Sequence, residues 1–244
     1  MWTWFYRLAS PPSVYRTAGK LTPWFMVVAA AAIGYGTVAG LVFAPPDYQQ
    51  GDAFRIVYVH APSAWLSQFA YTTMAVAGAI GLVWRIKVGH AVAAATAPIG
   101  ASFTLATLVT GSLWGRPMWG TYWAWDPRLT TELILLFLYV GVMSLRSAFE
   151  DPARGDRAAA LLALVGVVNV PIIHFSVVWW NSLHQGATVA KFGKPTMAAS
   201  MLWPLLSMAL GFMLFYGAVL CMRLQGEVLN RERQAKWVTE AIKS

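Results

Sequence analysis

The chain has 244 residues, of which 58% are hydrophobic and 11% are charged. A water-soluble domain needs roughly a quarter of its residues charged to cover its surface, so this composition excludes an ordinary soluble domain and makes membrane lipid a partner of the chain. The net charge is +8, but the basic residues flank apolar runs and form no stripe with interleaved aromatics, which argues against nucleic-acid binding. The single cysteine, Cys221, excludes a disulfide framework and a Cys-x-x-Cys pair.

The N-terminal segment does not have the pattern of a cleaved signal peptide. Residues 1–20 are aromatic and basic, contain Pro11 and Pro12, and lack an apolar core followed by a small-residue cleavage site. We therefore expect the first long apolar run to remain as a membrane-spanning helix.

Six apolar segments reach the length of about 20 residues that a spanning helix needs. They cover residues 22–44, 62–84, 91–113, 128–147, 159–179 and 198–222 approximately. The connections are too short for a soluble domain, so residues 1–244 are expected to form a single membrane domain: an all-α, polytopic bundle of six helices. Pro98 and Pro171 fall inside predicted spans, where neighbouring helices can satisfy the carbonyls that a proline kink frees.

Lysine and arginine counts predict the orientation of the bundle. One side carries 13 of these residues and the other carries 5. Both termini are therefore expected in the cytoplasm, and the segments 45–61, 114–127 and 180–197 are expected to face outward.

The outward segment 114–127 is rich in tryptophan. It contains Trp114, Trp119, Trp123 and Trp125. Its glycines and proline, at Gly115, Pro117 and Gly120, predict a folded loop or short helical turns. An interfacial aromatic belt is one interpretation. The other is a flat aromatic shelf for a large planar ligand, because such ring faces bury area through offset stacking.

Asp126 and Pro127 form a favourable helix start, with Asp as the N-cap and Pro at the first helical position. A capping role is therefore the first expectation for Asp126, and a ligand-binding role is the second. Arg128 and Glu132 are four residues apart on the helix that follows and are expected to be able to pair.

Two of the four histidines, His60 and His184, lie on the outward side, at similar depth and on either side of the tryptophan segment. Two neutral imidazoles suit a planar iron porphyrin, which histidine commonly ligates axially. His90 is expected to be a solvated interfacial residue. His174 lies within a span and is therefore a functional candidate, although an interhelical hydrogen bond near Pro171 is the preferred role.

The run Trp119-Gly120-x-x-Trp123-x-Trp125-Asp126 resembles the signature of the "WWD" haem-handling membrane proteins. Within that group, the six spans, His60, His184 and the lack of a large outer domain are similar to the haem exporter protein C family of the cytochrome c maturation system. The resemblance covers nearly the whole chain. It includes residues 44–51, 98–101 and 179–186.

The resemblance implies a haem-binding role at the periplasmic face of the bacterial inner membrane. The iron of haem b would lie between His60 and His184, beside the tryptophan loop 114–127. It also implies work beside the ABC-type subunits A and B and a small single-span protein D, with transfer of haem to the periplasmic haem chaperone E.

The two haem propionates require cationic partners near the bilayer. Arg55, Arg116 and Arg128 are the best placed of the outward basic residues, and arginine binds a carboxylate with two hydrogen bonds. Lys191 and Lys194 are expected to contact lipid headgroups instead.

The favoured hypothesis is a haem-presenting platform without enzymatic turnover. The chain has no Walker motif, so use of ATP would belong to partners. Three alternatives are weighed against it: a b-type electron-transfer cytochrome, a permease that moves haem across the membrane, and the related haem-ligase branch. The first would hold haem between histidines within the spans, but His90 and His174 lie at different depths.

Overall fold

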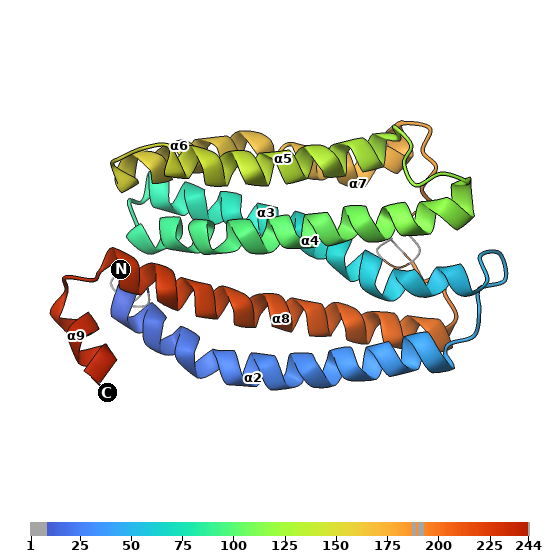
Figure 1. The fold of residues 1–244 in the computed structure, drawn as a ribbon, viewed down its shortest axis with the longest axis horizontal. Coiled ribbons are helices and arrows are strands. Elements are labelled where there is room, and N and C mark those ends of the chain that lie inside the picture. The colour runs from blue at the N-terminus through green and yellow to red at the C-terminus, as the bar shows by residue number, and fades with distance from the viewer. Residues whose placement is uncertain (1–8, 187–188, 190–192, 244) are drawn as a thin grey trace.

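The computed structural model describes residues 9–186, 189 and 193–243 (Figure 1). All regular elements of this part of the chain are helical. In chain order they are α2 (Pro11–Val38) with the π-turn η1 (Ala39–Phe43), the 3₁₀ turn η2 (Asp52–Ile56) with α3 (Val57–Val83), α4 (Lys87–Trp119), α5 (Pro127–Ser147), α6 (Pro152–Gly166), α7 (Asn169–Trp179), α8 (Ala199–Arg231) and α9 (Lys236–Lys243).

Six helical segments of the described chain are long and apolar enough to cross a membrane. Their bounds are Pro11–Phe43, Asp52–Val83, Lys87–Trp119, Pro127–Ser147, Pro152–Trp179 and Ala199–Arg231. The predicted all-helical, six-span architecture is therefore confirmed. Most spans extend several residues beyond the predicted bounds, because polar residues at helix ends lower the hydropathy there without breaking the backbone hydrogen bonds.

The helices lie in three layers (Figure 1). α2 packs along α8, α3 packs along α4, and α5 packs with α6 and α7, while the α3–α4 pair lies between the other two groups. The start of α2 and the end of α8 lie at one end of the bundle, here called the termini end. The turns after η1, α4 and α7 lie at the opposite end, here called the loop end.

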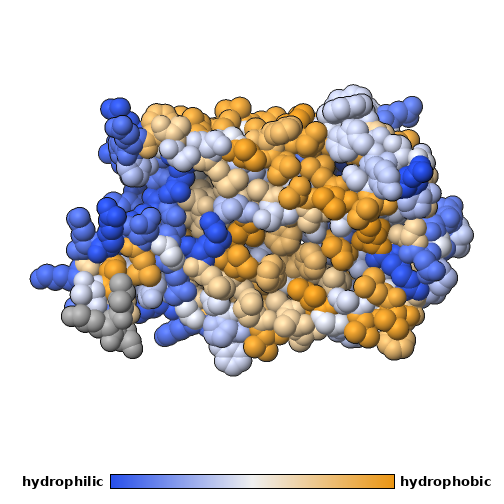
Figure 2. Space-filling view, viewed as in Figure 1, coloured by the Kyte–Doolittle hydropathy of each residue, from blue (hydrophilic) through white to orange (hydrophobic). Residues whose placement is uncertain are grey.

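Apolar residues cover much of the middle of the bundle on the face shown in Figure 2. Large apolar side chains of the spanning helices point outward; Trp24 on α2 is 72% exposed, Val165 on α6 72% and Val178 on α7 75%. A soluble domain rarely exposes contiguous apolar surface of this extent, so this apolar surface is the lipid-facing surface of a membrane protein.

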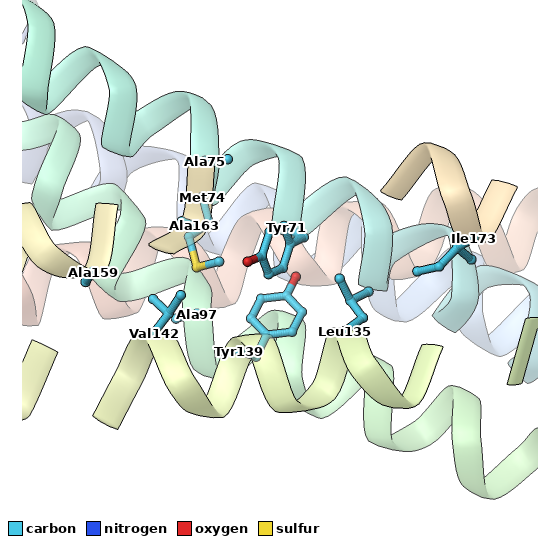
Figure 3. Packing of buried hydrophobic residues seen from close by; sticks show 10 residues of the cluster. All are labelled: Tyr71, Met74, Ala75, Ala97, Leu135, Tyr139, Val142, Ala159, Ala163 and Ile173. Carbon is cyan, nitrogen blue, oxygen red and sulfur yellow. The ribbon is translucent and has the colours of Figure 1, made fainter. Parts of the chain in front are cut away.

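The core between α3, α5 and α6 combines aromatic rings with small residues (Figure 3). Tyr71 and Tyr139 meet edge to face with ring centroids 4.9 Å apart, and the Tyr139 hydroxyl donates to the Ser67 carbonyl at 2.8 Å. A Cβ at Gly100 would lie 2.0 Å from the Tyr139 hydroxyl oxygen. Small residues thus admit large partners from the next helix, as is usual in membrane bundles.

The tryptophan-rich segment differs from the predicted loop. α4 continues through Gly115 and Pro117 to Trp119, and the helix ends at Gly120 with a left-handed φ of 76°. The expected helix breaks at Gly115 and Pro117 are wrong. A proline near a helix end costs one backbone hydrogen bond, which a membrane helix tolerates, whereas Gly120 provides the left-handed conformation that ends helices.

The fifth span consists of two helices, because α6 ends at Gly166 and α7 begins at Asn169. Pro171 lies in the first turn of α7, where a missing N–H costs no intrahelical bond. The Asn169 side chain donates to the Thr131 carbonyl of α5 at 2.9 Å.

His174 is exposed on α7 and meets the ring of Phe175. Its ring makes no hydrogen bond to a described residue, so the predicted interhelical bond is wrong. The two-residue interruption before α7 sets which side of that helix faces the bundle, and this offset is not visible in the sequence pattern.

Candidate functional site

His60 and His184 line the same narrow cavity at the loop end, with a volume of about 30 Å³. His60 comes from the first turn of α3, and His184 comes from the segment that follows α7. The remaining walls come from α3, α4 and α5. They are formed by Ala64, Gln68, Thr107, Leu108, Gly111, Arg128, Leu129 and Glu132.

A hydrogen bond orients the His60 ring. Its Nδ1 lies 3.0 Å from the Thr110 hydroxyl oxygen, and that hydroxyl donates its own proton to the Ala106 carbonyl at 2.6 Å. The Thr110 oxygen therefore accepts from Nδ1–H of His60, which leaves the Nε2 lone pair free for a metal ion.

Two neighbours on α4 restrict the position of the His60 ring further. The ring of Trp114 meets it edge to face with centroids 5.5 Å apart. A Cβ at Gly111 would lie 3.1 Å from Cε1 of His60, so the absence of a side chain at Gly111 admits the imidazole.

Asp126 joins the start of α5 to the segment that carries His184. Its Oδ1 accepts from the Arg128 backbone N–H at 2.8 Å, which is the predicted helix cap. Its Oδ2 accepts from the Leu183 backbone N–H at 2.7 Å, and Oδ1 also accepts from the Ser182 hydroxyl at 3.2 Å. Burial alone would raise the pKa of the Asp126 carboxyl, but these hydrogen bonds outweigh it and lower the pKa.

His184 is held as a neutral imidazole. Burial and the nearby charge of Arg128 lower its pKa to about 4, against a smaller opposing effect of Asp126. Its Nδ1 is buried, lies 3.8 Å from Oδ1 of Asp126, and has no hydrogen-bond partner among the described residues. A neutral imidazole with unused nitrogen is the form that ligates a metal.

The four predicted tryptophans fall into two groups. Trp114 contacts His60, and Trp119 contacts His184 with ring centroids 5.1 Å apart. Trp123 and Trp125 meet each other edge to face at 5.5 Å, and Trp125 is 77% exposed. The structure therefore brings one tryptophan to each histidine and leaves a second pair on the surface of the loop.

Arg128 is the arginine that the structure brings to the histidines. It lines the cavity with both imidazoles, and its guanidinium forms no hydrogen bond and no ion pair within the described chain. Arg128 and Glu132 form no ion pair within 4 Å in the described chain, although their charges interact. Glu132 instead accepts from the Ser67 hydroxyl at 2.7 Å.

The other basic candidates are not part of this cavity. Arg55 pairs with Asp52 at 2.9 Å and donates to the Gly40 carbonyl at 3.0 Å. Arg116 donates to the Gly120 carbonyl and lies over the ring of Tyr122 at 5.7 Å from its centroid. Both thus stabilise neighbouring turns. Lys194 is exposed, and Lys191 lies outside the described residues.

Three residues of the site were missed from the sequence: Gln68, Thr110 and the cavity-lining role of Glu132. For Gln68 and Glu132, helical spacing carried a usable signal. Gln68 lies eight residues after His60, and Glu132 lies four after Arg128, so each falls on the same helix face as a predicted residue. The pairing of Thr110 with His60 carried no such signal, since it joins residues 50 positions apart.

The donor set fits an iron porphyrin better than a bare metal ion. Within the described chain no group of three or more His, Cys, Asp or Glu residues is arranged to hold a metal ion. The two neutral imidazoles are suited to bind the iron of a haem. The unused donors of Arg128 suit a haem carboxylate, and the adjacent indole rings suit the face of the porphyrin.

Comparison with known proteins gives a consistent result over nearly the whole chain. Residues 4–239 match the family model described as heme exporter protein C. The chain is 50% identical to heme exporter protein C of Haemophilus influenzae, over 98% of this chain and 97% of that protein. It is 48% identical to heme exporter protein C of Escherichia coli K12, over 99% and 98% respectively.

A more distant relative comes from a plant. A Marchantia polymorpha mitochondrial protein, described as ccmC-like and assigned by its name to cytochrome c biosynthesis, is 38% identical over 87% of this chain and 88% of its own length. Taken with the full-length match to the family model, these relatives show that the chain belongs to the heme exporter protein C family.

Proposed function

We propose that this protein binds haem b at the loop end and presents it for transfer during cytochrome c maturation. The observation that carries the proposal is the meeting of two histidines, both free to ligate, with the unpaired guanidinium of Arg128 in one cavity. The names of the relatives, which refer to haem export and cytochrome c biosynthesis, support the same function.

Three residues of the cavity wall and two adjacent tryptophans have roles in this proposal. His60, through Nε2, and His184 would hold the haem iron. Arg128 binds a propionate, and Trp114 and Trp119 flank the two imidazoles. When bound, the haem iron itself supplies the attachment point for these ligands.

The cavity also indicates how haem enters and leaves. Its volume of about 30 Å³ is much smaller than a porphyrin, so binding requires His60 and His184 to separate. Of the two histidines, His184 is the better placed to move. Its segment, 182–184, is attached to the helices by hydrogen bonds to Asp126, whereas His60 is part of α3 itself. Movement of this segment would couple haem release to the protein that receives it.

The proposed setting follows the family resemblance. The site would face the periplasm from the bacterial inner membrane, beside ABC-type subunits A and B and the single-span protein D, and the recipient would be the haem chaperone E. A haem permease is less well supported. The break between α6 and α7 resembles the broken helices of permeases, but Asn169 there bonds to α5 and is not among the residues that line the cavity of His60 and His184.

The ligand assignment is tested by the absorption spectrum of the purified full-length protein. We expect wild type to show a six-coordinate haem spectrum. His60→Ala and His184→Ala should each lose this spectrum and retain less haem, whereas His90→Ala and His174→Ala should not. Wild-type spectra from both His60→Ala and His184→Ala would contradict the proposal.

A further inference from the structure

A second and much larger cavity lies at the termini end, with a volume of about 1110 Å³. It opens among the ends of α3, α4, α5, α6 and α8, and Figure 2 shows hydrophilic residues gathered at this end of the molecule. Its walls carry six cations and three acids. The cations are Arg85, Lys87, Arg146, Arg157, Arg231 and Arg233, and the acids are Asp156, Glu227 and Glu232.

Two of the acids are engaged by two of the cations. Asp156, whose side chain is 6% exposed, accepts from Arg146 Nε at 2.9 Å and from Arg231 Nη1 at 2.6 Å. Glu227 accepts from Arg231 Nε at 2.8 Å and also from Arg146. This network joins the ends of α5, α6 and α8.

The remaining cations of the cavity have no ion-pair partner within the part of the chain that the structure describes. Arg85 and Lys87 flank the short turn between α3 and α4, and Arg157 and Arg233 come from α6 and the segment after α8. A cavity with several unpaired cations favours an anionic ligand.

A smaller, mostly apolar recess of about 250 Å³ adjoins this cavity on the side towards the middle of the bundle. The two spaces share His90, Arg146 and Asp156 as wall residues. The deeper walls of the recess include Met74, Ala94, Ala97, Val142, Ala160 and Ala163. His90 was expected to be solvated, but it is half-buried against Gly81, at the junction of the two spaces.

The level of the cavity corresponds to the headgroup region of a bilayer. Trp84, at the end of α3, is 55% exposed beside Arg85, and tryptophan is enriched at membrane interfaces. Basic pockets between spanning helices at such interfaces are known to bind anionic lipid headgroups.

We propose that these two spaces bind one anionic phospholipid from the leaflet at the termini end, with its phosphate among the unpaired cations and an acyl chain in the apolar recess. A free phosphate ion would leave the recess without a ligand. A zwitterionic lipid would bring the positive charge of its own headgroup into a cavity that is already positive. This site is separate from the haem cavity and does not depend on the function proposed for it.

The test uses the full chain, purified in detergent with its phospholipid removed. Native mass spectrometry measures binding of phosphatidylglycerol, of phosphatidylcholine with the same acyl chains, and of inorganic phosphate. We expect one tightly bound phosphatidylglycerol, with weaker binding of the other two. The double variant Arg85→Gln/Lys87→Gln should bind phosphatidylglycerol at least about tenfold more weakly, because each basic residue near the surface contributes to the attraction of anionic lipid.

Two further variants separate the parts of the proposal. Arg16→Gln/Lys20→Gln removes the same charge from exposed positions of α2 outside the cavity, and should bind phosphatidylglycerol as wild type does. Ala94→Phe fills the recess and should weaken lipid binding while leaving phosphate binding unchanged. Equal binding of both lipids, equal loss in the two double variants, or wild-type lipid binding by Ala94→Phe would each overturn the proposal.

Discussion

The ligating ability of His60 depends on which of its ring nitrogens carries the proton. Thr110 decides this, because its hydroxyl proton is already donated to the Ala106 carbonyl and its oxygen can then only accept from Nδ1–H. A fixed tautomer holds Nε2 ready as a ligand and removes the cost of a proton shift on binding.

Replacing Thr110 with Val should therefore weaken haem binding although Thr110 touches no iron. Loss of such a supporting hydrogen bond commonly reduces metal affinity by about 10- to 100-fold. The measurement is haem titration by absorption. Thr72→Val is the matched control, since Thr72 makes the same hydroxyl-to-carbonyl bond on the exposed side of α3. Equal affinities of Thr110→Val and wild type would exclude this role.

His184 should resist protonation in the haem-free protein. Its pKa is lowered from 6.5 to about 4, chiefly by burial. Below pH 6.5 the unfolded chain binds a proton at His184 that the folded chain does not bind. The contribution of neutral His184 to the free energy of unfolding is therefore complete above pH 6.5 and is lost as the pH falls from 6.5 towards 4.

This pH dependence can be followed by NMR of protein labelled with ¹⁵N-histidine, with the His184 signals assigned through His184→Gln. We expect the ring of His184 to remain neutral at pH 5.5, where a solvent-exposed histidine is mostly protonated. A titration midpoint near 6.5 would show that the imidazole is not buried in solution.

At the scale of elements, a single carboxylate performs two tasks at the loop end. Asp126 caps α5 through Arg128 N–H and anchors the His184 segment through Leu183 N–H. Asn is also a good N-cap, but one side-chain oxygen cannot serve both positions. The change Asp126→Asn therefore separates the anchor from the cap.

We expect Asp126→Asn to keep α5 intact and to release haem about tenfold faster, because a hydrogen bond to a charged group contributes about 1.5–3 kcal/mol. Dissociation into excess apomyoglobin measures the rate, and circular dichroism measures helix content. Asp151→Asn is the matched control, since Asp151 caps α6 in the same way at the termini end. If Asp151→Asn accelerates release equally, the anchor is not responsible.

The elements that the sequence predicted are those governed by local rules. Hydropathy located all six spans, and the Asp-Pro pair located the start of α5. Two errors are local in origin. Pro117 fits within α4 because it lies near the helix end, and His174 faces outward because of an interruption seven residues earlier. The contacts that the sequence missed concern distant segments. The bonds of Asp126 to Ser182 and Leu183 span more than 50 residues, and no local pattern contains them.

The same division holds for the site residues. Both histidines, Arg128 and Trp119 were predicted, and the structure brings them together. Arg55 and Arg116 instead bond within their own turns, at separations of three and four residues. Such nearby partners compete with a ligand for the arginine and could be seen in the sequence. The prediction considered only on which side of the membrane each basic residue lies, so it did not take these partners into account.

At the scale of the whole molecule, the two ends of the bundle differ in chemistry. The termini end carries the ionic network of Arg146, Asp156 and Arg231, together with unpaired cations. The loop end carries the two histidines and the tryptophan segment. The excess of basic residues at the termini end predicts that this end faces the cytoplasm, and the cavity of His60 and His184 would then face the periplasm.

This orientation is tested by cysteine labelling in a Cys221→Ser background, which removes the natural cysteine. Thr121 lies in the exposed turn after α4, and Glu150 lies in the exposed turn between α5 and α6, at the opposite end. In cells with a permeabilised outer membrane and an intact inner membrane, a membrane-impermeant maleimide should label Thr121→Cys but not Glu150→Cys. Disruption of the inner membrane should then make Glu150→Cys reactive. The reverse pattern would place the cavity of His60 and His184 on the cytoplasmic side. It would exclude direct handover to a periplasmic chaperone but would leave the proposed role of the two histidines unaffected.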